Sequence, residues 1–319
     1  MVLYDNLLNR LFLMYDLIII GGGPAGTAAG VYASRKQLKT LFITAEWGGQ
    51  STVSPDIHNW IGTPSISGTK LAEDLEGHLR AYADGWVTIK DRSYVTNIEK
   101  TEAGHKVHFG TDESAEGTAI LIATGSKRRR LDVPGADELE HKGLTYCATC
   151  DGPIFSGQDV VVVGGGNAAF ETAAQLLAYT KSVTLLNRGD RYKADPITVD
   201  KVLAHPNMRG ILGATTTSIN GEKFVSGLTY TDADGAKQEL AATGIFLEIG
   251  MIPNTDYIGG VVPLDKYGRI EIDPWTQQTA TPGIWAAGDC TNIKYHQNNI
   301  SAGDAVKALE DIYVTLKTK

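Results

Sequence analysis

The sequence is poor in cysteine, in positive charge and in long apolar runs. Its 319 residues include only 3 cysteines, too few for the disulfide framework of a small secreted protein. The formal net charge of −8 argues against a general nucleic-acid surface. No apolar run approaches the roughly 20 residues that a membrane-spanning helix needs. We therefore expect a cytoplasmic protein of two domains, with no membrane and no nucleic acid among its partners.

Motifs of several enzyme classes are missing as well. The chain has no G-x-S-x-G and no P-loop, which argues against the usual hydrolases and kinases. Its histidines lack a metal-binding spacing such as H-E-x-x-H. A zinc site needs four ligands, and beyond Cys147 and Cys150 only Cys290 and His141 are available. No metal site is therefore predicted, and Cys290 is expected to be a small packed residue.

The sequence does contain a glycine-rich loop, residues 21–26, in the setting of a dinucleotide-binding fold. Gly21 would permit the sharp turn, Gly23 the approach of a pyrophosphate, and Gly26 the close packing of helix against strand. Glu46 follows about 20 residues later and is either the acid that binds a ribose or an ordinary loop carboxylate. The elements predicted around this loop are a buried parallel strand over 15–20, a small-residue helix over 27–37 and a strand over 40–44.

The same arrangement recurs in the second half of the chain, where residues 164–166 are again three glycines. The elements predicted around this second loop are a strand over 159–163, a helix over 170–179 and a strand over 183–186. Two such units indicate two dinucleotide sites, or one site and the relic of another.

The rest of the chain completes the first of these domains. Further strands are predicted at 119–123, 245–249 and 283–287, and the C-terminal stretch has the apolar spacing of a helix. We infer that residues 126–246 are inserted between the two halves of a first domain, 1–125 and 247–319. The linkers would lie near 126–134 and 242–246. The predicted fold class is α/β, with two Rossmann-like three-layer nucleotide-binding domains, the second inserted in the first.

A Cys-Ala-Thr-Cys-Asp-Gly run at residues 147–152 lies between the two glycine loops. A C-x-x-C suits thiol exchange, because the first sulfur can attack a partner disulfide while the second resolves the mixed disulfide. Asp151 either carries the proton that dithiol–disulfide conversion requires or caps a turn with Gly152. The position of the pair between two nucleotide-binding signatures indicates a dithiol that exchanges electrons with a flavin.

Two other segments each have two interpretations. The basic run at residues 127–130 is either a solvated turn or a docking patch for an acidic protein partner. Residues 1–13 are an amphipathic lead-in, or Met14 is the true start of the protein.

Together these residues resemble the low-molecular-weight thioredoxin reductases, which are FAD-dependent pyridine nucleotide-disulfide oxidoreductases. The likeness extends from about Tyr15 to the C-terminus, and the run Cys-Ala-Thr-Cys-Asp before a glycine loop is highly specific to that family. The other motifs that carry the likeness are Gly-Gly-Gly-Pro-Ala-Gly (21–26), Trp-Gly-Gly-Gln (47–50), His-Asn-Trp-Ile-Gly (58–62), Ala-Thr-Gly (123–125), Gly-Gly-Gly-Asn (164–167), Ile-Pro-Asn-Thr (252–255) and Ala-Gly-Asp (287–289).

The resemblance implies a homodimer in which the discontinuous domain binds FAD and the inserted domain would bind NADPH. It also implies that Cys150 faces the flavin, that Cys147 exchanges with the protein substrate, and that Asp151 is the acid and base. The dithiol must meet first the flavin and then an external disulfide. The resemblance therefore implies that the inserted domain rotates about its two linkers.

The cofactor contacts implied by the resemblance fall into two sets. Asp289 would hold a ribityl hydroxyl, and the helix after Gln297 would point its N-terminal dipole at the flavin pyrimidine. The FAD contacts are expected at Gly21, Gly23, Pro24, Ala25, Gly26, Thr44, Glu46, Gly48, Gly49, Gln50, Thr52, Asn59, Val95, Ala123, Thr124, Gly125, Gly288, Asp289, His296, Gln297 and Asn298. The pyridine-nucleotide contacts are expected at Gly164, Gly166, Asn167, Ala168 and Arg188.

The chain departs from the usual sequence of that family in two short segments, residues 187–193 and 296–298. The family usually shows His-Arg-Arg-x-x-x-Arg, which grips the NADPH 2′-phosphate, whereas residues 187–193 are Asn-Arg-Gly-Asp-Arg-Tyr-Lys. Each lost arginine–phosphate bond removes about 1.5–3 kcal/mol of binding, unless Arg191 compensates. Asn187 is not acidic either, so a clean switch to NADH is not indicated. Near the flavin, the common Arg-Gln-Ala is replaced by His-Gln-Asn at residues 296–298.

The sequence therefore predicts a thioredoxin-disulfide reductase. Electrons would pass from a donor to FAD, to the Cys147–Cys150 dithiol and to a thioredoxin-like protein. NADPH is expected to be a poor donor, with reduced ferredoxin or an unusual reductant as the replacement, and the choice between NADPH and NADH stays open. One alternative is an oxygen-dependent dithiol oxidase of the same fold. Another is a flavin-binding redox sensor that acts through a partner without turnover.

Overall fold

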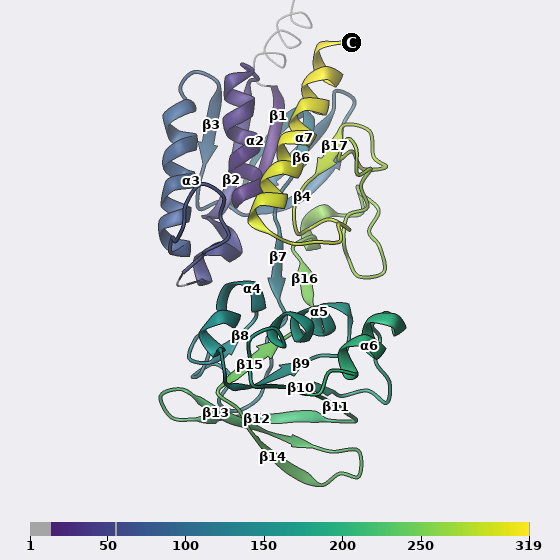
Figure 1. The fold of residues 1–319 in the computed structure, drawn as a ribbon. Helices are drawn as coiled ribbons and strands as arrows, with labels where there is room; N and C mark the ends of the chain where they lie inside the picture. The colour runs from purple at the N-terminus through teal and green to yellow at the C-terminus, as the bar shows by residue number, and fades with distance from the viewer. Residues whose placement is uncertain (1–13, 55, 319) are drawn as a thin grey trace, which may run out of the picture. The chain divides into compact units, whose positions relative to one another are not determined.

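A computed structural model describes residues 14–54 and 56–318, so the interpretation of residues 1–13 lies outside the described residues. The chain forms two compact units (Figure 1). Unit 1 contains the described residues up to Lys127 and those from Ile252 onward, and unit 2 is Arg128–Met251. The second unit is thus inserted in the first.

Unit 1 is built on a seven-stranded sheet that is parallel except at one edge. Across the sheet the strands are β3 (Val87–Lys90), β2 (Thr40–Trp47), β1 (Tyr15–Gly22), β6 (Glu113–Ile122), β5 (His105–Phe109) and β4 (Val95–Lys100), and β17 (Ile284–Ala286) also pairs with β6. The helices are α2 (Pro24–Arg35), α3 (Gly68–Tyr82) and α7 (Asn298–Lys317), with short 3₁₀ turns η1 (Gly49–Val53) and η3 (Asp256–Ile258).

The central strand β1 is buried on both faces. Leu17 and Ile19 pack in the cluster that contains the inner faces of α2 and α7. Ile18 and Ile20 pack in a second cluster on the opposite face. Successive side chains of a strand point to opposite faces, so a run of apolar residues is what a strand between two layers requires.

The first helix begins and ends earlier than the sequence predicts. The expected range was 27–37, whereas α2 is Pro24–Arg35. Pro24 occupies the first turn, where its missing N–H is not needed, and Gln37 has a left-handed φ of 56°, which ends the helix. None of the helices among residues 14–54 and 56–318 is both long and apolar enough to cross a membrane.

Unit 2 contains a parallel five-stranded sheet and a small antiparallel one. Across the parallel sheet the strands are β11 (Met208–Leu212), β10 (Ser182–Asn187), β9 (Asp159–Val163), β15 (Gly244–Leu247) and β8 (Leu144–Thr145). The antiparallel strands are β12 (Thr215–Gly221), β13 (Val225–Thr231) and β14 (Lys237–Ala241). The helices are α4 (Ala148–Asp151), α5 (Asn167–Leu176) and α6 (Pro196–Leu203), with a 3₁₀ turn η2 (Gly152–Phe155).

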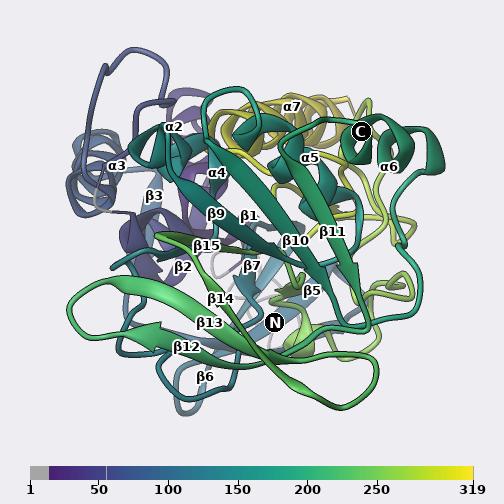
Figure 2. The same cartoon turned by 60° about the horizontal axis from the view of Figure 1, so that its bottom comes forward.

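The parallel sheet of unit 2 lies between helices and the antiparallel strands (Figures 1 and 2). Val160 and Val162 pack with Phe170 of α5 on one face. Val161 and Val163 pack with residues of β12 and β13 on the other. The expected fold class, α/β with two Rossmann-like three-layer units, is confirmed.

The return to unit 1 lies later in the chain than the predicted linker at 242–246. Gly244–Leu247 is strand β15, which pairs with β9 and β8 and is fully buried. Burial of this apolar run in the sheet leaves no linker there. The short strands β7 (Ser126–Arg128) and β16 (Met251–Pro253) lead into and out of unit 2, so the second boundary is at residues 251/252 rather than 246/247.

Candidate functional site

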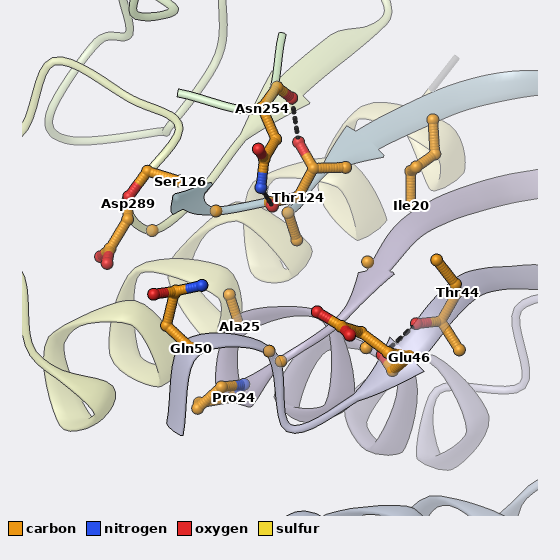
Figure 3. A pocket seen from close by; sticks show the side chains of 18 of the residues that line it. Ile20, Pro24, Ala25, Thr44, Glu46, Gln50, Thr124, Ser126, Asn254 and Asp289 are labelled. Atoms are coloured by element: carbon orange, nitrogen blue, oxygen red, sulfur yellow. Dashed lines mark hydrogen bonds between the residues drawn. The ribbon is translucent and has the colours of Figure 1, made fainter. Parts of the chain in front are cut away.

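A cavity of about 430 Å³ opens at the carboxyl ends of the parallel strands of unit 1 (Figure 3). Ligands of open parallel sheets bind at this edge. The wall includes many of the predicted FAD contacts: Gly21, Gly23, Pro24, Ala25, Thr44, Glu46, Gly48, Gly49, Gln50, Val95, Ala123, Thr124, Gly125, Gly288, Asp289 and Asn298. The predicted contacts that do not line it are Gly26, Thr52, Asn59, His296 and Gln297.

The three glycines singled out in the first loop differ in the space around them. A Cβ on Gly21, whose φ is 120°, would lie 2.2 Å from the Ala123 carbonyl oxygen. A Cβ on Gly26 would lie 1.8 Å from the Gly21 carbonyl oxygen. The nearest atom to a Cβ on Gly23 is 3.9 Å away, so Gly23 faces the open cavity. Gly21 and Gly26 are thus required by packing, and Gly23 leaves room for a ligand.

Helix α2 begins at the cavity wall. Its N-cap residue, Gly23, has no side chain, so no side-chain group satisfies the first N–H groups of the helix. Such an N-terminus carries partial positive charge and binds phosphate groups. The cavity therefore has a ready site for a pyrophosphate.

Polar side chains surround the other parts of the cavity (Figure 3). The Asn254 amide donates to the Thr124 carbonyl oxygen at 2.9 Å, and the Thr124 hydroxyl donates to the Asn254 carbonyl oxygen at 2.8 Å. Asp289 accepts from the Ser301 hydroxyl at 3.2 Å and lies 3.3 Å from His296 Nδ1. Glu46 lies at the end of β2, where an acid can accept from a ribose. Phosphate, ribose and polyol sites in one cavity fit a flavin dinucleotide.

The start of α7 is tied to the segment that follows β2. Gln297 Oε1 accepts from the Asn59 amide at 3.0 Å, and Asn298 Oδ1 accepts from the Ser51 hydroxyl at 3.0 Å. The Asn299 amide donates to the Asn59 carbonyl oxygen at 2.7 Å. Asn59 and Gln297 therefore hold the cavity wall together without lining it.

Several wall residues were not predicted. Ile20, Ile43, Ser51, Ser93, Tyr94, Ser126, Lys127, Asn254, Tyr257, Ala287 and Ser301 line the cavity as well. Asn254 lies in the Ile-Pro-Asn-Thr motif at 252–255, which was a signal that pointed to it. Tyr257 and Ser301 come from distant parts of the chain, and no local pattern marks them.

Cys147 and Cys150 form a disulfide in unit 2, with their Cα atoms 5.3 Å apart. Cys147 is the N-cap of α4, and its Sγ accepts from the Cys150 N–H at 3.2 Å. The Asp151 N–H closes the same turn on the Cys147 carbonyl oxygen at 3.0 Å. The two sulfurs are thus held within bonding reach by the backbone, as thiol exchange requires.

Neighbouring side chains support the dithiol turn. The Thr145 hydroxyl donates to Asp151 Oδ2, and the Tyr179 hydroxyl donates to the Ala148 carbonyl oxygen at 3.4 Å. Asp151 makes no side-chain cap bond to the turn that begins at Gly152, so the alternative capping role is not seen. A Cβ on Gly152 would lie 2.0 Å from the Tyr179 hydroxyl, so a larger residue here would displace the Tyr179 side chain. Thr145 was not predicted as a site residue.

Cys290 takes no part in this turn. It is fully buried in unit 1, and burial raises the pKa of its thiol to about 12. It is the small packed residue that the sequence predicts. Within residues 14–54 and 56–318, no group of three or more His, Cys, Asp or Glu side chains is placed to hold a metal ion.

The second glycine loop is partly covered by the segment after β10. The Asn187 amide donates to the carbonyl oxygens of Gly189 and Arg191 at 3.2 and 2.8 Å. The Lys193 N–H donates to the Gly165 carbonyl oxygen at 2.7 Å. Gly166 alone of the three glycines would have no atom within 4 Å of an added Cβ, so a ligand can approach there. The predicted Asn167 and Ala168 begin α5 beside it, and the predicted Arg188 side chain is exposed.

Glu248 lies at the end of β15, next to that loop. Its Oε1 accepts from the Thr172 hydroxyl of α5 at 2.7 Å. The pKa of Glu248 is raised to about 7, mainly because the carboxyl is buried. The negative charge of Glu171 also raises this pKa, whereas the hydrogen bond from Thr172 and the positive charge of Arg128 lower it. This carboxyl was not predicted from the sequence, because its burial depends on the packing of α5 on the sheet.

Comparisons with known proteins agree with this geometry. The profile of the family described as pyridine nucleotide-disulphide oxidoreductase matches residues 15–303. One of the subunits of alkyl hydroperoxide reductase in Escherichia coli is 38% identical over 296 residues, which cover 92% of this chain and 57% of that protein. NADH dehydrogenase of Bacillus subtilis is 34% identical, with 92% of this chain and 57% of that protein covered. The chain thus spans little more than half the length of these relatives.

Solved structures match over almost the whole chain. Thioredoxin reductase from Streptococcus pyogenes has a TM-score of 0.85 and 34% identity, covering 96% of this chain and 99% of that one. Thioredoxin reductase from Giardia duodenalis has a TM-score of 0.88 and 32% identity, covering 95% and 99%. The similarity includes both units and their order.

We expect Gly23→Val to remove most of the flavin, because the new side chain fills the space at the start of α2. Binding should weaken by about tenfold or more, which corresponds to ~1.4 kcal/mol. The ratio of flavin to protein absorbance after purification measures it. Gly166→Val, the matched change in the second loop, should keep its flavin. A fully loaded Gly23→Val protein would contradict the placement.

Glu248 should make stability fall as pH rises from about 4.5 to 7. The folded protein keeps a proton on this carboxyl that the unfolded chain has lost, so its contribution is complete below pH 4.5 and lost above pH 7. Glu248→Gln should therefore be more stable than the parent at pH 8 by about 1–3 kcal/mol, since one pKa unit equals about 1.4 kcal/mol. Thermal unfolding between pH 5 and 8 tests this. The exposed variant Glu239→Gln, on β14, should follow the parent. Identical pH profiles for the parent and Glu248→Gln would refute the prediction.

Proposed function

The chain belongs to the pyridine nucleotide-disulphide oxidoreductase family, and on this premise we propose that it is an FAD-dependent disulfide reductase of the thioredoxin reductase type. The observation that carries the proposal is the Cys147–Cys150 disulfide with Asp151 beside it. This turn lies in a unit inserted into the unit whose cavity fits a flavin dinucleotide.

Residues of unit 1 hold the cofactor. The N–H groups at the start of α2 bind the pyrophosphate, and Gly23 gives them room. Glu46 accepts from the adenosine ribose, and Asp289 accepts from a ribityl hydroxyl. Held there, FAD would supply two-electron transfer between a donor and the disulfide.

The dithiol then reduces an external disulfide by exchange. The Cys147 thiolate attacks the partner, Cys150 resolves the mixed disulfide, and Asp151 takes up or gives the proton. Two electrons leave the dithiol, which returns to the disulfide, and the partner becomes a dithiol. The same three residues therefore serve both halves of the exchange.

The acceptor is a thioredoxin-like protein. The similarity to two thioredoxin reductase structures over at least 95% of this chain supports this acceptor. The likeness to one component of an alkyl hydroperoxide reductase makes another component of such a reductase the second candidate. A homodimer and a cytoplasmic location, both expected from the sequence, are part of the same proposal.

The donor is a pyridine nucleotide bound at the second glycine loop, with NADPH disfavoured. Of the three family arginines only Arg188 is present, while position 189 is glycine and position 193 is lysine. Asn187, which ends β10, is not an acid that could bind a ribose, and its amide is engaged by its own loop. The likeness to an NADH dehydrogenase supports NADH, and reduced ferredoxin is the other candidate.

Replacing either Cys147 or Cys150 with serine should abolish reduction of a thioredoxin-like disulfide, by about 10³-fold or more, because exchange needs both sulfurs. Bound flavin should be retained, since neither cysteine lines the cavity. Steady-state reduction assays and flavin absorbance measure the two effects, with Cys290→Ala as an active control. Retained activity in both serine variants would contradict the assignment.

Two other outcomes would favour the alternative functions. Oxygen uptake on addition of a small dithiol would favour the dithiol oxidase. A bound flavin that no donor or dithiol reduces would favour the redox sensor.

Restoring the missing arginines should improve NADPH binding. Gly189 has an ordinary backbone, and a Cβ there meets nothing closer than 3.4 Å, so Gly189→Arg fits without strain. In Gly189→Arg/Lys193→Arg, NADPH should bind at least about tenfold tighter, since each charge-assisted bond contributes about 1.5–3 kcal/mol. NADH binding should not change. Stopped-flow reduction of the flavin by NADPH, NADH and reduced ferredoxin measures this, and rapid, tight reduction of the parent by NADPH would contradict the proposal.

A further inference from the structure

The buried hydroxyl of Thr145 connects the strand before the dithiol with the acid after it. Thr145 is the last residue of β8 and is only 4% exposed. Its hydroxyl donates to Asp151 Oδ2 and accepts from the Cys147 N–H at 3.4 Å. Thr145 also pairs with Phe246 of β15, so the parallel sheet holds this hydroxyl in place.

The two bonds determine which way the hydroxyl proton points. A backbone N–H can only donate, so the Thr145 oxygen is the acceptor toward Cys147. Its single proton is then directed at Asp151, and Oδ2 of that carboxyl acts as an acceptor. Oδ1 receives no hydrogen bond from any other residue that the structure describes, so this is the oxygen left to exchange a proton.

The dithiol turn is held closed without the Thr145 hydroxyl. The Asp151 N–H bonds to the Cys147 carbonyl oxygen, and the Cys150 N–H bonds to Cys147 Sγ. The Tyr179 hydroxyl holds the turn at Ala148. Loss of the Thr145 hydroxyl would therefore leave the turn in place and free the Asp151 carboxylate to rotate.

We propose that Thr145 is a positioning residue that orients Asp151, so that Oδ1 can deliver its proton to the dithiol. The inference rests on the proposed function. In the reductive direction an incoming thiolate forms a bond to Cys147 Sγ, and the Sγ–Sγ bond breaks with its electron pair on Cys150. That sulfur takes the proton from Asp151 Oδ1. A second thiolate of the reductant then displaces Cys147, so the reductant is oxidised to a disulfide and the protein disulfide is reduced.

The test measures reduction of the Cys147–Cys150 disulfide by dithiothreitol in the full chain with its flavin bound, without nucleotide or partner protein. Reaction is stopped by alkylation, and mass spectrometry counts the modified cysteines. The disulfide of Thr145→Val should be reduced about tenfold more slowly than that of the parent. This loss is smaller than the roughly 10²–10⁴-fold that a positioned acid contributes, because Asp151 is still present. Thr145→Ser, which keeps the hydroxyl, should restore the parent rate. Thr180→Val is the matched control, because Thr180 is also buried in unit 2 but its hydroxyl donates to the Leu176 carbonyl oxygen instead of to Asp151.

A double variant distinguishes positioning from general support of the turn. If Thr145 acts through Asp151, Thr145→Val should add nothing to the loss seen in Asp151→Asn, because the two changes remove one effect. If the rate loss in the double variant equals the product of the two single losses, the inference is overturned. A parent rate in Thr145→Val would overturn it as well. Should Thr145→Val not fold, Thr145→Ala is measured with the same expectations.

The result for Asp151→Asn distinguishes failure of the role of Thr145 from failure of the proposed function. A slow Asp151→Asn with a fast Thr145→Val overturns the inference and leaves the proposed function standing. A parent rate in Asp151→Asn overturns both the role of Thr145 and the proposed acid. A slow rate in both single variants, with no further loss in the double variant, supports the inference.

Discussion

Parallel pairing of strands is the constraint on which both sites depend. In unit 1, β1, β2, β6 and β17 run in the same direction, so the loops that follow them meet at one edge and form the cavity. In unit 2 the same rule brings together the residues that follow or end β8, β9, β10 and β15. These are Thr145, Gly164, Asn187 and Glu248. In each unit these residues therefore lie at the carboxyl edge of a parallel sheet, where ligands of such sheets bind.

Polar groups gathered at such an edge need partners, and their partners determine what they can do. Thr145 holds Asp151, Thr172 holds Glu248, and Asn187 is engaged by the turn that follows it. A buried polar group without a partner costs about 1–3 kcal/mol, so these pairings are strongly preferred. One oxygen of Asp151 is thereby fixed beside the dithiol turn, whereas the Asn187 amide is bonded within its own loop. The hydrogen bonds around the dithiol turn thus hold the residues that the exchange would need. The hydrogen bonds of Asn187 instead occupy a side chain beside the second glycine loop.

The family relationship explains why the two sides can differ. The match to the pyridine nucleotide-disulphide oxidoreductase profile and the match to the solved structures both extend over the two units. This chain therefore shares the fold of both units with those proteins. The side chains of Arg188, Arg191 and Lys193, where the resemblance leads us to expect the phosphate contacts, are exposed. Such positions can change without cost to the fold, because surface substitutions usually alter stability by less than about 0.5 kcal/mol.

The sequence by itself determined the family, the fold class, the two glycine loops and the dithiol. These are local signals: a turn that needs Gly21, an apolar run buried on both faces, and two cysteines one helical turn apart. The boundaries of α2 and the return at residues 251/252 were missed, because helix caps and buried strands are decided by packing. Only the tertiary structure brought Asn254 to Thr124, Ser301 to Asp289 and Thr172 to Glu248. Those contacts join residues far apart in the chain, and no spacing in the sequence records which distant group satisfies a buried hydrogen bond.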